Sequence, residues 1–130
     1  MENEFWWNLY DKAVANCNER EISDSVFVGS VSAVIFTEKG NIYRGVSVDT
    51  ACSMGYCAER NAIGSMLTAG ESAINKLVAV RNKEILMPCG VCREFLMQLG
   101  KKNKETEILV SLSPLRVVKL GELLPYYWNK

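Results

Sequence analysis

A long apolar run followed by a tight turn is the feature that most restricts what this chain can fold into. Residues 26–37, "VFVGSVSAVIFT", are rich in β-branched and apolar side chains. The turn "EKGN" separates them from residues 42–48, "IYRGVSV", in which apolar and polar residues alternate. Such a pattern predicts two antiparallel strands joined as a β-hairpin. The chain is therefore expected to build its core around a sheet that contains residues 26–48.

The other segments alternate between helical and strand patterns. Helices are indicated by an apolar stripe at helical spacing, by Pro88 at a helix start, and by Gly70 and Gly100 at helix ends. The predicted elements are helices at 3–20, 57–69 and 88–99, a loop at 51–56, and strands at 76–81, 107–113 and 115–120. This order predicts one α/β domain, residues 1–130, in which helices cover both faces of a single sheet.

Composition excludes several classes of function. Fifteen basic and fifteen acidic side chains cancel, so no overall charge attracts nucleic acid or an anionic membrane. No apolar run approaches the roughly 20 residues of a membrane span, and the N-terminal segment "MENEFWWNLYDK" lacks the pattern of a signal peptide. Five cysteines without an export signal indicate reduced thiols in the cytoplasm, where metal binding or catalysis is favoured over disulfides.

Three of these cysteines stand at predicted helix starts. Cys89 and Cys92 have the spacing of a chelating pair directly after Pro88, and Cys57 begins the preceding helix. Unpaired N–H groups at a helix N-terminus favour a thiolate. Three protein ligands with an open fourth position are typical of a catalytic zinc site, so we expect one Zn²⁺ per chain. In the alternative, Cys52 is a fourth ligand that would close the site.

Two neighbours of Cys57 carry further expectations. Glu59 follows two residues later and is well placed for general acid/base work on a water in the open position. Three thiolates and Zn²⁺ sum to a charge of −1, and Arg60 is expected to offset that charge by donating to a sulfur.

At these residues the chain resembles the zinc-dependent cytidine deaminase family. The motifs C-A-E and P-C-x-x-C are similar to the small, all-cysteine, homotetrameric type, which includes cytidine deaminases and blasticidin S deaminase. "SVSAVIFTEKGNIYRGVSV" resembles the family's first hairpin and "GELLPYYW" its C-terminal segment. The resemblance implies a three-layer α/β/α fold with a five-stranded mixed sheet, zinc on the three cysteines, and proton transfer by Glu59. Water would add to C4 of cytosine, N3 would be protonated and ammonia would leave.

The same resemblance suggests substrate-binding residues. Backbone groups at Ala58 would contact the base, and Trp128 stands where an aromatic residue enters the pocket of the adjacent subunit, which implies a homotetramer with sites near interfaces. Family cytidine deaminases hold ribose with Asn-x-Glu, but Ser47 and Asp49 occupy those positions here. Gly29 falls where they carry a phenylalanine that shapes the sugar pocket.

Three functions follow as hypotheses. The first is hydrolytic deamination of a small cytosine nucleoside, cytidine or deoxycytidine, in pyrimidine salvage. The second is deamination of an aminoacylnucleoside antibiotic such as blasticidin S, because both replacements at the ribose positions are short. The third is a zinc-stabilised nucleoside-binding protein without turnover, for which a carboxylate beside an open metal position would have no use.

Overall fold

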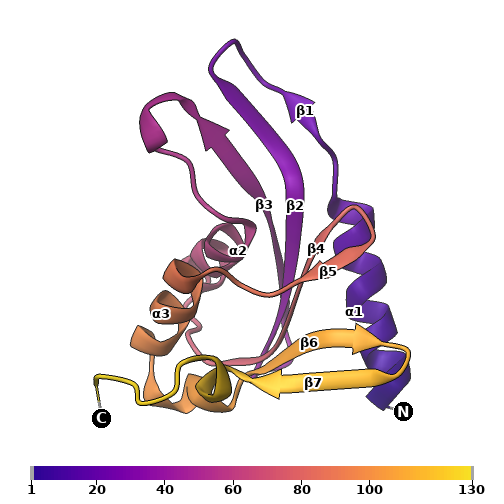
Figure 1. Ribbon diagram of the computed structural model, residues 1–130, viewed down its shortest axis with the longest axis vertical. Coiled ribbons are helices and arrows are strands. Elements are labelled where there is room, and N and C mark those ends of the chain that lie inside the picture. The colour runs from indigo at the N-terminus through magenta and orange to yellow at the C-terminus, as the bar shows by residue number, and fades with distance from the viewer. Residues whose placement is uncertain (1, 130) are drawn as a thin grey trace.

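Strand β2 is the centre of the fold in the computed structural model, which describes residues 2–129 (Figure 1). It pairs along one edge with β3 and along the other with β4 and β1. The elements are α1 Glu2–Asn16, β1 Arg20–Glu21, β2 Val26–Thr37, β3 Ile42–Thr50, η1 Ala51–Ser53, α2 Ala58–Thr68, β4 Ile74–Arg81, β5 Glu84–Leu86, α3 Gly90–Gln98, η2 Lys101–Glu105, β6 Glu107–Leu112, β7 Leu115–Lys119 and η3 Leu120–Leu123.

The sheet is mixed and has seven strands. Strands β4 and β6 run parallel, and the other pairs are antiparallel. The five predicted strands are present with small changes at their ends. The prediction of a five-stranded sheet missed β1 and β5, because two exposed residues and a three-residue strand are too short to give a hydrophobic period. The predicted helix over 3–20 ends at Asn16.

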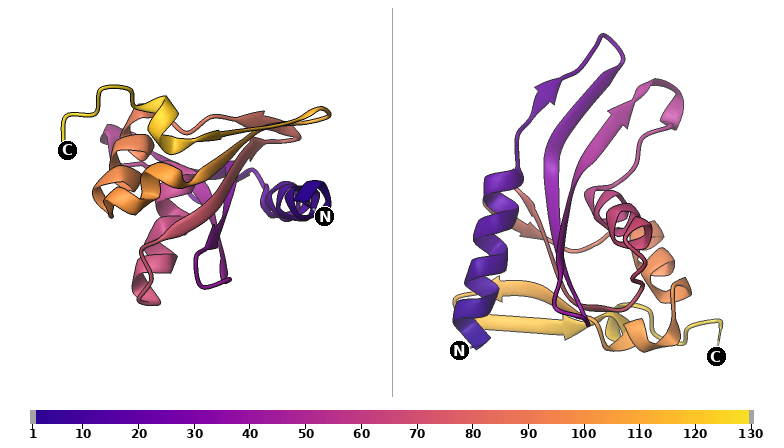
Figure 2. Two further views of the ribbon diagram at one scale, coloured as in Figure 1. Left: turned by 90° about the horizontal axis from the view of Figure 1, so that it is seen from below. Right: turned by 180° about the vertical axis from the view of Figure 1, so that it is seen from behind.

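Helices cover both faces of the sheet, as the element order predicted (Figure 2). Consecutive β2 residues point to opposite faces. Val34 packs with Trp6 and Leu9 of α1, whereas Ile35 packs with side chains of α2 and α3. The apolar run of β2 is therefore buried on both sides. Within residues 2–129, no helix is long and apolar enough to cross a membrane.

Helix α2 lies against β3 where that strand has no side chain. A Cβ on Gly45 would stand 2.5 Å from the carbonyl oxygen of Ala58 and 2.3 Å from the amide nitrogen of Ala62. The Asn61 amide accepts a hydrogen bond from the Val46 N–H at 3.3 Å. These contacts set the N-terminus of α2, where Cys57 lies, directly over the sheet.

Candidate active site

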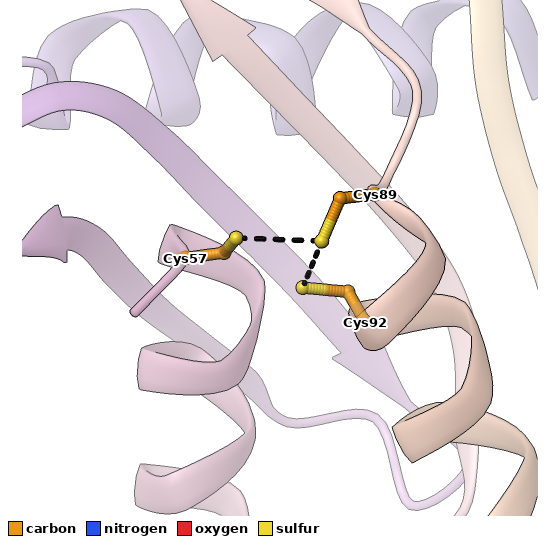
Figure 3. Close-up of side chains that lie close together, drawn as sticks. All are labelled: Cys57, Cys89 and Cys92. Atoms are coloured by element: carbon orange, nitrogen blue, oxygen red, sulfur yellow. Dashed lines mark hydrogen bonds between the residues drawn. The ribbon is translucent and has the colours of Figure 1, made fainter. Parts of the chain in front are cut away.

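Three thiols meet between the starts of α2 and α3 (Figure 3). Cys57 and Cys89 are the N-cap residues of the two helices, and Cys92 lies in the first turn of α3. The Cys89 Sγ atom is 3.4 Å from the Cys57 Sγ atom and 3.4 Å from that of Cys92. All three sulfurs lie within 4.8 Å of one another. The structure therefore brings together the three cysteines that the spacing singled out.

This donor set fits one zinc ion. Zn–S bonds of about 2.3 Å in a tetrahedron separate the sulfurs by about 3.8 Å. The two Sγ distances from Cys89 are 3.4 Å each and the third pair lies within 4.8 Å, so the three sulfurs are close enough to share one ion. Within residues 2–129 the possible metal-binding group contains these three cysteines and no fourth ligand. Cys52 is exposed in η1, so the alternative of a closed site with Cys52 as its fourth ligand has no support in the geometry.

The three thiols differ in how readily they ionise. Burial raises the pKa of the Cys57 thiol and, more strongly, that of Cys92, which also faces the Glu59 carboxylate. At Cys89 burial acts in the same direction, but hydrogen bonds from the Cys92 and Val91 backbone and from the neighbouring thiols outweigh it and lower the pKa. Cys89 is thus the thiol whose pKa is lowered, in the direction that a helix start favours. A divalent cation supplies the positive charge that three adjacent thiolates require.

Arg60 and Glu59 flank this group. The Arg60 Nη2 atom is 3.9 Å from the Cys57 Sγ atom, which agrees with the predicted contact to a sulfur. The Glu59 side chain is buried, with 4% exposure, and burial raises the pKa of its carboxyl group. A carboxyl with a raised pKa accepts and returns a proton more readily near neutral pH.

A pocket of about 530 Å³ opens beside the thiols. Its lining includes the predicted residues Ser47, Asp49, Cys57, Ala58, Glu59, Arg60 and Cys89. Sequence reasoning missed other lining residues, among them Ser30, Tyr56, Arg81, Leu86 and Met87. The missed residues come from the irregular part of β2, from the segment between η1 and α2, from the β4–β5 hairpin and from the position directly after it. No motif in the sequence marks these segments.

Ser47 has a structural task in addition to lining the pocket. Its hydroxyl oxygen accepts a hydrogen bond from the Val31 N–H at 3.0 Å and lies 3.1 Å from the Ser30 hydroxyl. These bonds hold β2 against β3 where their register shifts between Val28 and Ser32. The Ser47 hydroxyl is thus already engaged, while Asp49 lies exposed at the pocket rim.

Gly29 belongs to that irregularity and is not part of the pocket lining. Its φ is +87°, and a Cβ there would lie 2.1 Å from the Asn18 carbonyl oxygen. The backbone conformation and the close approach of Asn18 explain the glycine, because both exclude a side chain.

Trp128 lies outside the pocket of its own chain. Its Nε1–H donates to the Glu94 carboxylate at 3.1 Å, next to the Tyr127 hydroxyl, which donates to the same carboxylate at 2.6 Å. With 69% of its surface exposed, Trp128 is accessible to another subunit. Its entry into a neighbouring pocket stays a prediction.

Residues 8–107 match the family model for the cytidine and deoxycytidylate deaminase zinc-binding region. The chain belongs to this family. Its relatives include a cytidine deaminase of Mycobacterium tuberculosis. The two chains are 30% identical over 98 residues, which cover 74% of this chain and 70% of the relative. A blasticidin-S deaminase of Bacillus cereus is 33% identical over 112 residues, with 77% of each chain covered.

Solved structures agree with the assignment to the cytidine deaminase family. The crystal structure of cytidine deaminase from Mycobacterium tuberculosis superposes with a TM-score of 0.78 at 25% identity, covering 96% of this chain and 98% of that one. The enzyme from Burkholderia pseudomallei gives a TM-score of 0.73 at 26% identity, with 92% and 96% covered. The three-thiol group and the zinc-binding region of the family model together identify the cofactor as zinc.

Proposed function

We propose that this chain catalyses the hydrolytic deamination of a small cytosine nucleoside, cytidine or 2′-deoxycytidine, to the uracil form with release of ammonia. The observation that carries the proposal is the buried carboxyl group of Glu59 in the lining of a pocket that also contains Cys57 and Cys89. A nucleoside-binding protein without turnover would gain nothing from a buried acid there. Burial of the carboxyl group would only cost free energy, because the group is desolvated.

Different residues of the site have different roles in the proposed reaction. Cys57, Cys89 and Cys92 would hold zinc, which supplies a Lewis acid that makes water nucleophilic near neutral pH. Glu59 takes a proton from the attacking water and delivers it to N3 of the base. A second proton passes to the amino group as the C4–N bond breaks, so that water and the cytosine form become the uracil form and ammonia. Arg60 partly offsets the negative charge of the thiolates.

The shape of the pocket supports an orientation for the nucleoside. Ala58 and Glu59 are buried, whereas Asp49 and Ser53 are exposed. In our proposal the base lies at the buried end, near backbone groups of Ala58, and the sugar lies at the rim. Asp49 then accepts hydrogen bonds from sugar hydroxyls.

A second candidate is a cytosine nucleoside analogue with a substituted sugar, as in blasticidin S. The engaged hydroxyl of Ser47 favours it, because that side chain does not replace the ribose contact of the family's asparagine. The similarity to the Bacillus cereus blasticidin-S deaminase also supports this candidate.

The proposal extends to the oligomeric state, the domain organisation and the cellular location of the protein. We propose a homotetramer, supported by the resemblance to the small deaminases and by the exposed Trp128. Residues 1–130 would form one domain, supported by a single sheet that runs from β1 to β7. The free thiols of all five cysteines are compatible with action in the cytoplasm.

Substitution of the buried carboxyl tests the reaction directly. Purified protein is assayed by loss of cytosine absorbance and by ammonia release with cytidine, deoxycytidine, cytosine and blasticidin S. Glu59→Gln should retain zinc and melt as the original protein does, while kcat falls by at least about 10²-fold, the usual scale for loss of general acid–base catalysis. Wild-type turnover by Glu59→Gln would remove Glu59 from the mechanism, and an inactive wild-type protein with full zinc would contradict the proposed function.

A further inference from the structure

Arg81 is the basic residue of the pocket lining that the proposed zinc group, with Arg60 beside it, does not use. It is the last residue of β4 and is exposed. Asn82 and Lys83 form the turn to β5, with Asn82 at φ +56°. This two-residue turn fixes the backbone of Arg81 in the ladder opposite Glu84.

Strand alternation explains why the Arg81 side chain is at the pocket. Val78 and Val80 pack in the cluster that contains α1. Leu77 and Ala79 face the other way, and Ala79 packs against Ala58, the residue after Cys57. Arg81 continues the second series. One strand repeat, about 7 Å, therefore separates it from the residue beneath the start of α2.

The guanidinium of Arg81 is available for a ligand. Across residues 2–129, none of the ion pairs includes Arg81, and its side chain makes no hydrogen bond. Glu84 lies directly opposite in the strand pairing but forms no ion pair with it. An arginine without a partner at the rim of a pocket is suited to bind an oxyanion, because its N–H groups match carboxylate or phosphate oxygens in pairs.

We propose that Arg81 is a specificity-determining residue that binds an anionic group, carboxylate or phosphate, attached to the sugar of the substrate. The inference rests on the proposed function for the orientation of the nucleoside, with the base at Glu59 and the sugar at the exposed rim. In that orientation the sugar and its substituents meet Arg81 and Asp49. The Asp49 carboxylate accepts hydrogen bonds from sugar hydroxyls, and Arg81 adds a preference for a negatively charged substituent.

The kinetic test compares neutral and anionic substrates. Cytidine, cytidine 5′-monophosphate and cytidine 5′-carboxylate are assayed with the wild-type protein, Arg81→Gln, Arg81→Lys and Lys83→Gln. Lys83 is the matched control, since it carries the same charge in the adjacent turn but does not line the pocket. Arg81→Gln should lower kcat/KM for the preferred anionic substrate by about 10- to 100-fold, mainly through KM. Its kcat/KM for cytidine should fall by a smaller factor than its kcat/KM for that anionic substrate.

The other two variants test whether charge alone is sufficient, and the two anionic substrates identify the preferred oxyanion. Arg81→Lys should recover part of the loss, and Lys83→Gln should change neither substrate class. Phosphate and carboxylate serve as separate arms, so the preferred oxyanion is identified by the larger loss in Arg81→Gln. Equal losses for cytidine and for both anionic substrates, or equal losses in Arg81→Gln and Lys83→Gln, would overturn the assignment.

A binding measurement separates this inference from the deaminase proposal. Calorimetry with uridine, uridine 5′-monophosphate and uridine 5′-carboxylate requires no turnover. Wild-type protein should bind one anionic product at least about tenfold more tightly than uridine, and Arg81→Gln should lose that difference. A protein that deaminates nothing yet shows this preference would refute the proposed function and support the role of Arg81. Equal affinities for all three products would refute the role of Arg81, even for an active deaminase.

Discussion

The position of each cysteine decides what its thiol can do. The sulfurs of Cys57 and Cys89 lie at helix starts, and Cys92 is buried in the first turn of α3. Cys52, five residues before Cys57, is exposed in η1 and outside the group. Proximity in sequence is therefore a poor guide here, because the turn at η1, where Cys52 has φ +62°, separates the two side chains.

Replacement of single thiols tests the zinc ligands. Cys57→Ala, Cys89→Ala and Cys92→Ala should each lose most of the bound zinc, since two thiolates hold the ion far less tightly than three, and activity should fall with it. Cys52→Ala is the matched control and should retain one zinc per chain. Elemental analysis of the four purified variants measures this directly. Full zinc content in all three ligand variants would contradict the assignment.

At the scale of elements, the irregular part of β2 shapes the pocket as much as the helix starts do. Its register against β3 shifts between Val28 and Ser32, and Ser47 bonds the displaced backbone at Val31. This irregularity brings Ser30 and Val31 into the pocket lining. The shape of the sugar side of the pocket therefore depends on backbone geometry that a strand pattern does not reveal.

Two glycines with similar positive φ angles test how strongly the irregular part of β2 depends on a residue without a side chain. Gly29 has φ +87° and the Asn18 carbonyl oxygen where a Cβ would be, whereas Gly40 has φ +90° and open space. Gly40→Ala should lower the free energy of unfolding by about 1 kcal/mol, the cost of the left-handed conformation. Gly29→Ala should lower it by about 2 kcal/mol or more, because backbone must also move. Urea unfolding measures both, and equal losses would show that Asn18 yields without cost.

The contact between the β2–β3 turn and the loop after α2 predicts a dependence on pH. The Glu71 carboxylate accepts hydrogen bonds from the Asn41 amide and the Tyr43 hydroxyl at 2.7 Å each. Hydrogen bonds from Thr37 first, then from Tyr43 and Asn41, lower its pKa. A lowered pKa in the folded state stabilises the fold above the unfolded-state value, about 4.3 for glutamate, and this contribution is lost as pH falls through the folded-state pKa.

The prediction concerns the difference in Tm between the wild-type protein and Glu71→Gln. That difference should be constant above about pH 5 and should shrink as the pH falls below about 4. Thermal melts across this range provide the measurement, and Glu19→Gln, at an exposed position, is the control. A difference that grows on acidification would show that the sign of the pKa shift is wrong.

For the whole molecule, the C-terminal segment connects the fold to assembly. Tyr127 packs against the core cluster beneath α2 and α3, while Trp128 is exposed beside it and donates to Glu94. Trp128→Ala should therefore leave the fold and the zinc content intact. If Trp128 completes a neighbour's pocket, this variant should lose at least about tenfold in kcat/KM, a loss of about 1.4 kcal/mol in transition-state stabilisation.

Mixed oligomers distinguish a neighbour's pocket from the chain's own. Glu59→Gln subunits retain Trp128, and Trp128→Ala subunits retain Glu59, so co-refolding of the two should restore part of the activity. Native mass spectrometry confirms that the mixed species form and measures the oligomeric state. Trp7→Ala, on an exposed aromatic of α1, controls for nonspecific effects. No recovery in confirmed mixed oligomers, or a monomeric protein, would contradict the role across subunits.

Much of the molecule could be predicted from the sequence, and the failures have a common cause. The main strands and helices were predicted because their apolar periods are long, and the zinc group was predicted because ligand spacing and helix starts are local signals. The missed features, β1, β5 and Arg81, depend on short pairings and on which face a strand residue occupies after a turn. Such features are decided by tertiary contacts, which leave no period in the sequence.

The arrangement of the three thiols also has a consequence for the unfolded chain. Cys57 and Cys89 are 32 residues apart, and the segment between them contains all of α2 and β4. An ion held by both ends closes this segment into a loop, which removes conformations from the denatured ensemble much as a covalent crosslink does. For a loop of this length the entropic gain is on the order of 3–4 kcal/mol. Even a catalytically inert metal of suitable geometry would therefore raise the unfolding temperature, independently of any chemistry in the pocket.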